Sequence, residues 1–524
     1  MITIPGIILS RISRNQDNFP CGRRLPETRF LLREIPSRLK KSDSHSILIR
    51  IFGDIRFWVV LFFLIRLVGI SNPPLEFSHN WRQVTGLMVA RNLLEINPNL
   101  FFPRVEGANG DVEIIGMEFP LLNYGHMLLA RFCGYQHWFG RFINLFVSTV
   151  GVFYFFKIIQ FWLKSSHAAL FSSILLCSSI WFSFSRKMMP DTFSISLVFT
   201  GLWCGILYYC RQKSAHLLLF FFMLSIGLLA KIPSILYLIP FLVIISIQNG
   251  VDNRGKKLLV AASFSTLICL IWYLVWCPKL SIDYQSWFNS GKSFSIGFKE
   301  VLIKYKDSLH NFTFHAFQGY AGFFLFIAGV LSALFKKEKK LLLFLMITGG
   351  GFLLFIFKAG WFFYHHNYYI IPFVPAMAIL GGYALSLIKR QWMVVLILSV
   401  CVLESVYNQV PDFFVSETEE YKLTLEKILD GISSRDDRII TNGNGNPQML
   451  YLAHRKGWSC VDWEITELRH IQKVADRSCK FIVIDRHASD ELDKLKLPLK
   501  SAFENDDFRI YHTSFEKSGL SVWP

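Results

Sequence analysis

Long apolar blocks separated by short polar linkers dominate the hydropathy pattern of this chain. A helix needs about 20 residues to cross the hydrocarbon core of a bilayer, and most of the blocks approach that length. The pattern therefore predicts an α-helical polytopic membrane protein with about 11 spans. The predicted spans are 55–71, 138–162, 168–184, 190–210, 216–231, 233–248, 258–277, 318–335, 340–357, 368–387 and 392–407.

The charges of the linkers alternate along the chain, which predicts an orientation. Lys and Arg mark every second connection, and basic connections face the cytoplasm. The basic N-terminal tail, residues 1–54, has no secretory signal pattern and is predicted to be cytoplasmic. The alternation holds only if residues 72–137 form a large first exoplasmic loop. Within that loop, the short apolar stretch 119–133 is expected to be a re-entrant or interfacial helix.

The composition changes after residue 410. Residues 411–524 combine strand-like segments at 438–441, 480–485 and 508–512 with the helical patterns PQMLYLAHR and TELRHIQKVAD. This alternation predicts a small soluble α/β domain outside the cytoplasm. Its NGNGN segment, 442–446, is typical of a plain turn between a strand and a helix. Cys460 and Cys479 lie in this domain, where an oxidising compartment would allow them to pair.

The overall composition agrees with a membrane protein. Of the 524 residues, 52% are hydrophobic and only 18% are charged. The net charge of +17 resides mainly in the linkers between apolar blocks, where it faces anionic lipid, so nucleic-acid binding is a poor interpretation.

Polar residues gather in the connections predicted to be exoplasmic. Charged groups at membrane depth are costly, so their presence near span ends suggests a function. Several cations beside a few carboxylates suit an anionic, lipid-linked phosphate substrate next to a general base. The candidate catalytic residues are Glu118 and Asp191. The candidate substrate-binding residues are His79, Arg82, Arg91, Arg186, Lys187, Lys231, His365, His366, Tyr368 and Tyr369.

Each candidate also has a structural interpretation. Arg82 and Arg91 could reach towards lipid headgroups, and Lys231 could cap the span that it ends. Arg186 and Lys187 could be structural, and the two adjacent histidines could be interfacial aromatic residues. Glu118 is the sharpest candidate, because a carboxylate between Met117 and Phe119 needs a partner or a role.

Five segments carry a family resemblance that covers roughly residues 55–410. WRQVTGLMVARNLLE resembles a WRQADT-type loop start, GMEFPLLNY resembles the acidic-x-Pro element that closes the loop, and RKMMPDTFS, LLAKIPS and HHNYYIIPFVP resemble three later elements. In this order they resemble the GT-C class of membrane glycosyltransferases. They are closest to family 39, which contains protein O-mannosyltransferases and the lipid A aminoarabinose transferases.

The resemblance implies an inverting transfer of a sugar from a polyprenyl-phosphate donor to an acceptor outside the cytoplasm. The acceptor would be lipid A, a polysaccharide intermediate or a protein. Glu118 would match an acidic position of the family, while Lys231 and His365–Tyr369 would contact the donor phosphate. Thr85 stands where the family has an Asp, and His79 and Asn80 replace other acids. Either Glu118 works alone with basic partners, or Asp191 or Glu113 supplies a second acid, and a divalent metal remains possible.

Two alternatives stay open. The chain could be a transporter or flippase for lipid-linked glycans, although it shows neither an internal repeat nor strong charge in mid-span. It could also be an inactive relative that binds lipid-linked sugar. The motif variants resemble those of bacterial members, so the expected location is a bacterial inner membrane with the site facing the periplasm. The C-terminal domain is expected to cap that site or to recruit the acceptor.

Overall fold

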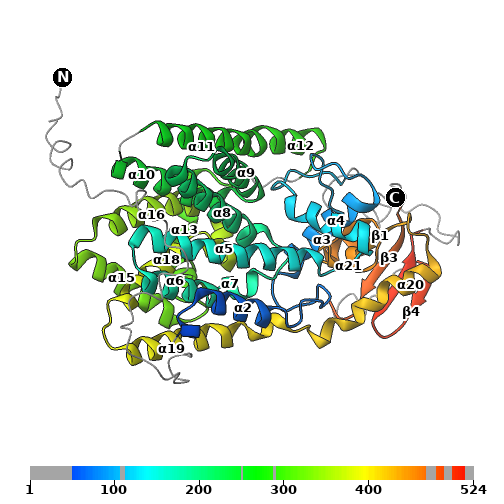
Figure 1. Ribbon diagram of the computed structural model, residues 1–524. Coiled ribbons are helices and arrows are strands. Elements are labelled where there is room, and N and C mark those ends of the chain that lie inside the picture. Colours follow the sequence, from blue (N-terminus) through cyan, green and yellow to red (C-terminus); the bar gives the residue numbers. More distant parts are fainter. Residues whose placement is uncertain are drawn as a thin grey trace.

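The computed structural model describes residues 50–106, 113–249, 252–286, 291–467, 479–488 and 499–513. Nearly all of the predicted tail, residues 1–49, lies outside the described residues. The described chain forms a helical bundle that carries a small sheet at one end (Figure 1). Every predicted apolar block contains at least one bundle helix. The main bundle helices are α2 (Ile55–Arg66), α5 (Phe139–Leu163), α6 (Ser166–Ser178), α8 (Pro190–Arg211), α9 (Ser214–Ala230), α10 (Leu238–Asn249), α11 (Asn253–Ile271), α12 (Cys277–Asp283), α13 (Phe294–Ile303), α15 (Tyr320–Phe335), α16 (Lys339–Ala359), α18 (Val374–Ser386) and α19 (Gln391–Gln409).

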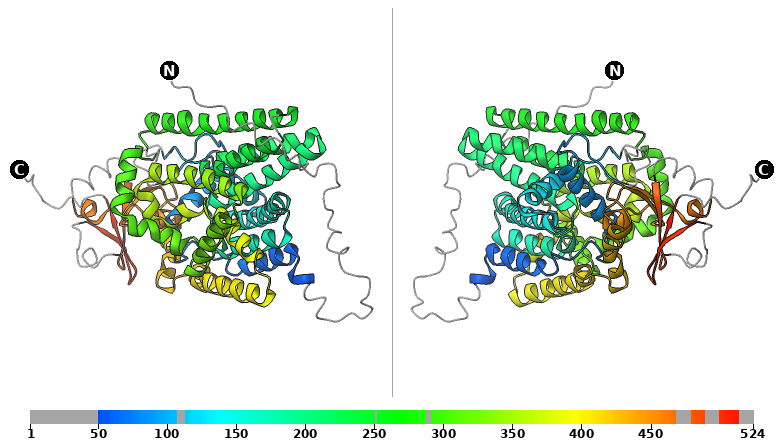
Figure 2. Two further views of the ribbon diagram at one scale, coloured as in Figure 1. Left: turned by 90° about the vertical axis from the view of Figure 1, so that its left-hand side faces the viewer. Right: turned by 90° about the vertical axis from the view of Figure 1, so that its right-hand side faces the viewer.

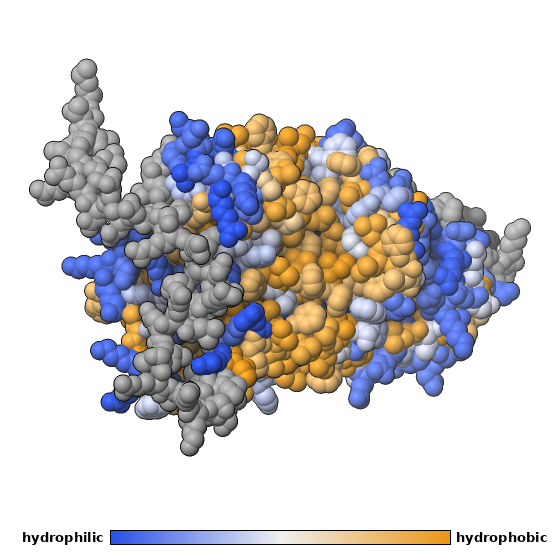
Figure 3. Space-filling view, in the orientation of Figure 1, coloured by the Kyte–Doolittle hydropathy of each residue, from blue (hydrophilic) through white to orange (hydrophobic). Residues whose placement is uncertain are grey.

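The bundle is that of a multi-pass membrane protein. Within the described ranges, five helices are long and apolar enough to cross a membrane, and a pair bent by 91° around residues 315–320 would add a sixth. Four further apolar helices have 10–17 residues. The space-filling view shows an apolar band between two polar ends (Figure 3). The number of 11 spans stays a prediction, because several helices are shorter than a full crossing.

The two ends of the bundle differ in what they carry. Helices α3 (Asn80–Glu95) and α4 (Leu121–Cys133), both from the predicted first loop, lie with the sheet at one end. The connection into the basic start of α11 lies at the opposite end (Figures 1 and 2). This arrangement agrees with a cytoplasmic side at the basic end. Helix α4 confirms the short helix expected at 119–133.

Small residues allow α8 to pack closely against its neighbours in the centre of the bundle. A Cβ added to Gly227 of α9 would lie 2.9 Å from a Val198 methyl group of α8, and one added to Gly201 of α8 would lie 3.2 Å from the backbone nitrogen of Leu224. The Ser194 hydroxyl of α8 also donates a 2.7 Å hydrogen bond to the Gly227 carbonyl. Close approach of this kind is how helices associate inside a bilayer. It fixes the position of the start of α8 relative to the end of α9.

The C-terminal domain contains a five-stranded sheet with the order β2-β1-β3-β5-β4. Strands β1 (Arg438–Thr441), β3 (Cys479–Asp485) and β5 (Phe508–His512) confirm the three predicted strands. Pattern reasoning missed the short edge strands β2 (Gly457–Ser459) and β4 (Ser501–Glu504). β2 and β3 flank β1 in parallel, whereas β5 is antiparallel to both β3 and β4.

Short helices complete this domain. These are α20 (Leu425–Ile432), α21 (Gln448–Leu452) and α22 (Asp462–Thr466). Helix α21 falls within the predicted PQMLYLAHR helix, whereas most of the TELRHIQKVAD pattern lies outside the described residues. Cys460 and Cys479 are both buried, and neither takes part in the disulfide considered from the sequence.

Candidate functional site

An ion pair between Arg82 and Glu118 forms the first part of the site. Arg82 lies in the first turn of α3, and its guanidinium contacts a carboxylate oxygen of Glu118. The two side chains keep 21% and 15% of their exposure, so both remain accessible from outside the bundle. The backbone next to Glu118 is held firmly, because the Trp272 indole donates to the Met117 carbonyl and the Phe119 amide donates to the Leu229 carbonyl.

The second part of the site lies where α9 ends and α8 begins. Lys231 follows the last residue of α9 in an extended conformation, and its Nζ lies 3.7 Å from Oδ1 of Asp191. Asp191 occupies the first turn of α8 after Pro190, a position where the helix dipole favours a carboxylate. Asp191 is 5% exposed, and its Oδ2 has no hydrogen-bond partner among the described residues. A buried carboxylate oxygen of this kind is available to a ligand.

The Tyr-rich segment joins these two parts. Tyr369, in the 3-10 turn Asn367–Ile370, interacts electrostatically with Lys231, Asp191 and Arg82. Its hydroxyl can donate a hydrogen bond. The His366 ring stacks on both Tyr368 and Tyr369, with ring centroids 5.3 and 6.0 Å away.

Two histidines line the same region in their neutral form. Burial lowers the pKa of His366, and the nearby cations lower it further. Burial and Lys187 together lower the pKa of His79 to about 4. Neutral His79 donates from Nε2 to Oδ1 of Asn367 at 2.9 Å, and its ring packs against Tyr368. The formal positive charge of the site therefore comes from Arg82 and Lys231.

Three of the predicted cations have partners elsewhere in the protein. Arg91 is 9% exposed, lies over the Tyr451 ring at 4.0 Å and donates to the Tyr451 carbonyl, which links α3 to the C-terminal domain. Arg186 is fully buried and contacts Glu76, while Lys187 pairs with Asp412 at 3.3 Å.

The remaining candidates are also placed by the structure. His365 is exposed and packs edge-on against Trp361, 4.4 Å between ring centroids. Glu113 pairs with Lys456 of the C-terminal domain at 3.5 Å, which leaves Asp191 as the second acid beside the Arg82 and Lys231 cations. Thr85 is a helical residue of α3 whose hydroxyl donates to the Trp81 carbonyl.

Sequence reasoning missed a buried charge cluster behind the site. Glu76 is fully buried between Arg141 at 3.3 Å and Arg186 at 3.4 Å, and Gln83 donates to its second oxygen. A buried carboxylate needs such partners, and the cluster fixes the chain that leads into α3. The available signal was Glu76 itself, an acid near the start of the predicted first loop. Its partners Arg141 and Arg186 lie at distant positions, one of them within a predicted span, so the pattern did not join them.

The described residues do not fit a metal site. No group of three His, Cys, Asp or Glu side chains comes together among them. Glu118 is engaged by Arg82 and Asp191 lies beside Lys231, so each carboxylate already has a cationic neighbour.

Comparisons with known proteins agree on the fold. Residues 119–276 match the family model described as dolichyl-phosphate-mannose-protein mannosyltransferase. The crystal structure of ArnT from Cupriavidus metallidurans bound to undecaprenyl phosphate superposes with a TM-score of 0.57 at 13% identity, covering 89% of this chain and 100% of that chain. The crystal structure of the Archaeoglobus fulgidus oligosaccharyltransferase with Zn and sulfate gives a TM-score of 0.54 at 12% identity, covering 83% of this chain and 68% of that chain. No curated protein matches the sequence.

Together the family match and these two structures show that the chain resembles the GT-C glycosyltransferases and has their fold. The match begins at Phe119, directly after Glu118, and it includes both Asp191 and Lys231.

Proposed function

We propose that this protein is an inverting membrane glycosyltransferase that moves a sugar from a polyprenyl-phosphate donor to an acceptor outside the cytoplasm. The observation that carries the proposal is the convergence of the Arg82–Glu118 pair and the Lys231–Asp191 pair on Tyr369. The family match and the ArnT structure, whose title includes undecaprenyl phosphate, support a lipid-linked donor.

Glu118 is the proposed general base. Its carboxylate accepts the proton of an acceptor hydroxyl while that oxygen attacks the anomeric carbon of the donor sugar. The new glycosidic C–O bond forms as the bond between the anomeric carbon and the phosphate oxygen breaks. The electron pair leaves with the phosphate, giving a polyprenyl phosphate monoester, and attack from the opposite face inverts the anomeric centre.

Arg82 and Lys231 are the proposed phosphate-binding cations. A phosphate monoester is a competent leaving group once its added charge is stabilised, so no proton donor is required. Tyr369 and neutral His366 add hydrogen bonds without adding charge. In the absence of substrate, Arg82 is held by Glu118. A donor phosphate competes for the same guanidinium, so donor binding would release Glu118 to meet the acceptor.

We place Arg91, Arg186 and Lys187 outside this chemistry, as positioning residues. Asp191 orients Lys231, since its carboxylate lies 3.7 Å from the ammonium group. The proposed location is a bacterial inner membrane, which the resemblance of the motif variants to bacterial members supports. The site is proposed to face the periplasm, which the basic connection into α11 at the opposite end of the bundle supports.

A transfer assay tests the proposal. The full chain in nanodiscs is given a panel of radiolabelled polyprenyl-phosphate sugars, with native envelope extract as the acceptor. We expect label to move from the donor lipid to an acceptor and to carry the inverted anomeric configuration. Donor binding without transfer would instead support an inactive relative. Movement of donor across proteoliposomes without transfer would support a flippase.

A further inference from the structure

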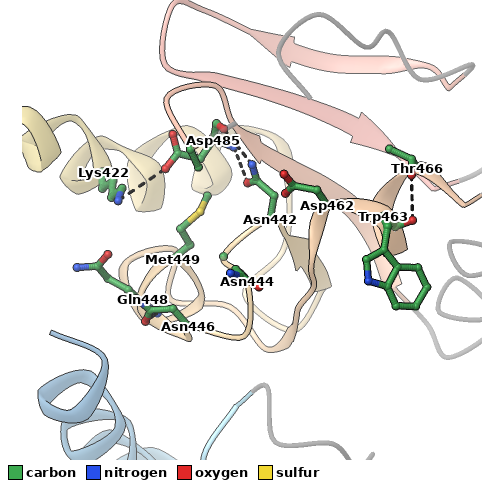
Figure 4. Close-up of a pocket in the computed structure, with 12 residues that line it drawn as sticks. Lys422, Asn442, Asn444, Asn446, Gln448, Met449, Asp462, Trp463, Thr466 and Asp485 are labelled. Carbon is green, nitrogen blue, oxygen red and sulfur yellow. Dashed lines mark hydrogen bonds and ion pairs between the residues drawn. The ribbon is translucent and has the colours of Figure 1, made fainter. Parts of the chain in front are cut away.

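The C-terminal domain contains a polar cavity that the proposed chemistry does not use. Its volume is about 680 Å³, within the range of about 300–1,000 Å³ typical of small-molecule sites. The cavity lies at the carboxyl ends of β1 and β3 (Figure 4). Its principal polar lining residues are Asn442, Asn444, Asn446, Gln448, Asp462 and Asp485.

The position of this cavity follows from the strand order. From β1 the chain passes through α21 to β2 on one side, and then crosses to β3 on the other side of β1. Where the strand order of a parallel sheet reverses in this way, a crevice opens beyond the carboxyl ends of the neighbouring strands. Ligands bind in such crevices. Asn444 and Gly445 have φ values of 50° and 80°, which lie in the left-handed region of backbone conformation. Asn and Gly tolerate this conformation, which explains their presence in the NGNGN turn.

The lining favours an uncharged ligand that both donates and accepts hydrogen bonds. Asn and Gln side chains do both, and Asp462 and Asp485 accept. Lys422 also lines the cavity, but it lies 3.4 Å from Glu419 and 3.7 Å from Asp485, so its charge is already opposed. Two carboxylates repel a phosphate.

Some of these polar groups are fixed and others are free to bind. Asn442 exchanges two hydrogen bonds with the backbone of Asp485, at 2.8 and 3.0 Å, which holds its amide at the base of the cavity. The carboxylate of Asp462 faces the cavity beside Asn442 (Figure 4). Convergent amides and carboxylates suit the hydroxyl groups of a sugar ring, which both donate and accept hydrogen bonds.

The cavity adjoins the proposed transfer site. A Cβ on Gly445 would lie 3.4 Å from the ring of Trp81, which directly precedes Arg82 in the first turn of α3. Gln448 also donates to the Pro74 carbonyl, 3.1 Å away, in the chain that leads into α3. A molecule held in this cavity would therefore lie next to the start of the helix that supplies Arg82.

We propose that this cavity binds a saccharide and, resting on the proposed function, that it holds the glycan portion of the acceptor. Asp462 accepts hydrogen bonds from the ring hydroxyls. The cavity is thus a specificity site that selects the acceptor, separate from the Arg82 and Lys231 site that binds the donor phosphate.

Saturation-transfer difference NMR tests binding directly. The probes are methyl glycosides of glucose, mannose, galactose and N-acetylglucosamine, added to the full chain in phosphatidylcholine nanodiscs, which contain no sugar. We expect signal from at least one glycoside, strongly reduced in Asp462→Asn. Asp436→Asn is the matched control, because Asp436 is an exposed carboxylate of the same domain that does not line the cavity, and it should retain the signal. Absence of signal from every glycoside, or equal signal in all variants, would overturn the proposal.

Two further measurements separate this inference from the proposed function. Glu118→Gln should retain glycoside binding, whereas loss of binding in that variant alone would place the sugar in the transfer site and overturn the inference. In the transfer assay, Asp462→Asn should raise the acceptor KM roughly tenfold while donor KM is unchanged, since a hydrogen bond to a charged group is lost. Transfer without glycoside binding would refute the cavity but leave the transferase standing. Glycoside binding without transfer would support the cavity and refute the transferase.

Discussion

Replacement of Glu118 by Gln is the sharpest test of the proposed chemistry. Gln has nearly the same shape and its side-chain oxygen can still accept from Arg82, so the change removes the base and leaves the packing. A positioned general base contributes about a hundredfold to ten-thousandfold to rate, or about 3–5 kcal/mol of the barrier. We therefore expect kcat to fall by that factor.

The cost to folding should be much smaller. Glu118 and Arg82 keep 15% and 21% of their exposure, so solvent screens part of their attraction. Exposed pairs contribute about 0–1 kcal/mol, and Gln retains a neutral hydrogen bond, so we expect a loss of stability of about 1 kcal/mol. Donor binding should persist or tighten in Glu118→Gln, because Arg82 no longer pairs with a carboxylate.

The assay is steady-state transfer in nanodiscs, with kcat, donor KM and the pH profile of kcat/KM measured for each variant. Loss of the base should remove the acidic limb of that profile. Glu113→Gln is the matched control, since Glu113 lies in the same loop but pairs with Lys456 of the C-terminal domain. A Glu118→Gln enzyme with kcat within about threefold of wild type would refute the assignment, because loss of a base costs at least about a hundredfold.

The Arg82→Gln variant distinguishes a base from a residue that only positions Arg82. If Glu118 acted only by holding Arg82, the single variants and the double variant would show the same loss, expressed mainly in donor KM. If Glu118 is the base, Arg82→Gln should raise donor KM while Glu118→Gln lowers kcat, and the two effects should be largely separate.

Four other outcomes are expected. Burial, with a contribution from Glu113, raises the pKa of Glu106 from 4.5 to about 7. The stability that the protein has below pH 4.5 should therefore be lost as the pH rises through 7. Thermal unfolding should show this loss as about 3 kcal/mol in the free energy of unfolding, and Glu106→Gln should abolish the pH dependence. Arg91→Ala should cost about 2–4 kcal/mol and loosen the C-terminal domain, seen as faster limited proteolysis, because it removes the guanidinium that lies over Tyr451. Lys231→Met should raise donor KM about tenfold or more with folding preserved, measured by donor titration, since a charge-assisted phosphate contact is lost. A chelator should leave the transfer rate unchanged, because the described residues hold no set of metal ligands, and loss of activity restored by added Mn²⁺ would contradict that result.

The helices were predictable because the bilayer imposes a simple rule on the chain. Every backbone group in a span must be satisfied internally, so long apolar blocks become helices wherever they occur. The same rule does not set their lengths. The block at 168–184 divides into α6 and a short helix, Trp181–Phe184, and the block at 368–387 begins with a 3-10 turn before α18. At the break after α6, side chains of α19 satisfy the freed backbone, because Gln409 accepts from the Ser183 amide and Ser405 and Gln409 donate to the Ser178 carbonyl.

The candidate site was only partly predictable, and the reason lies in pairing. Glu118, Arg82, Asp191 and Lys231 were each identifiable as charges at the ends of apolar segments. Which charges meet depends on tertiary distances that no local pattern contains. Arg186 follows a predicted span just as Lys231 does, yet it turns inward to Glu76, 110 positions away in sequence.

The neutral state of His79 and His366 illustrates the same limit. From the sequence, His366 was counted with the cations that stabilise phosphate. Burial beside Arg82 and Lys231 removes that charge, because two nearby cations disfavour a third. The site therefore has two fixed cations and two carboxylates, a balance close to neutral before substrate arrives. Adding the donor phosphate then leaves a net negative charge, which favours departure of the polyprenyl phosphate once the sugar has been transferred.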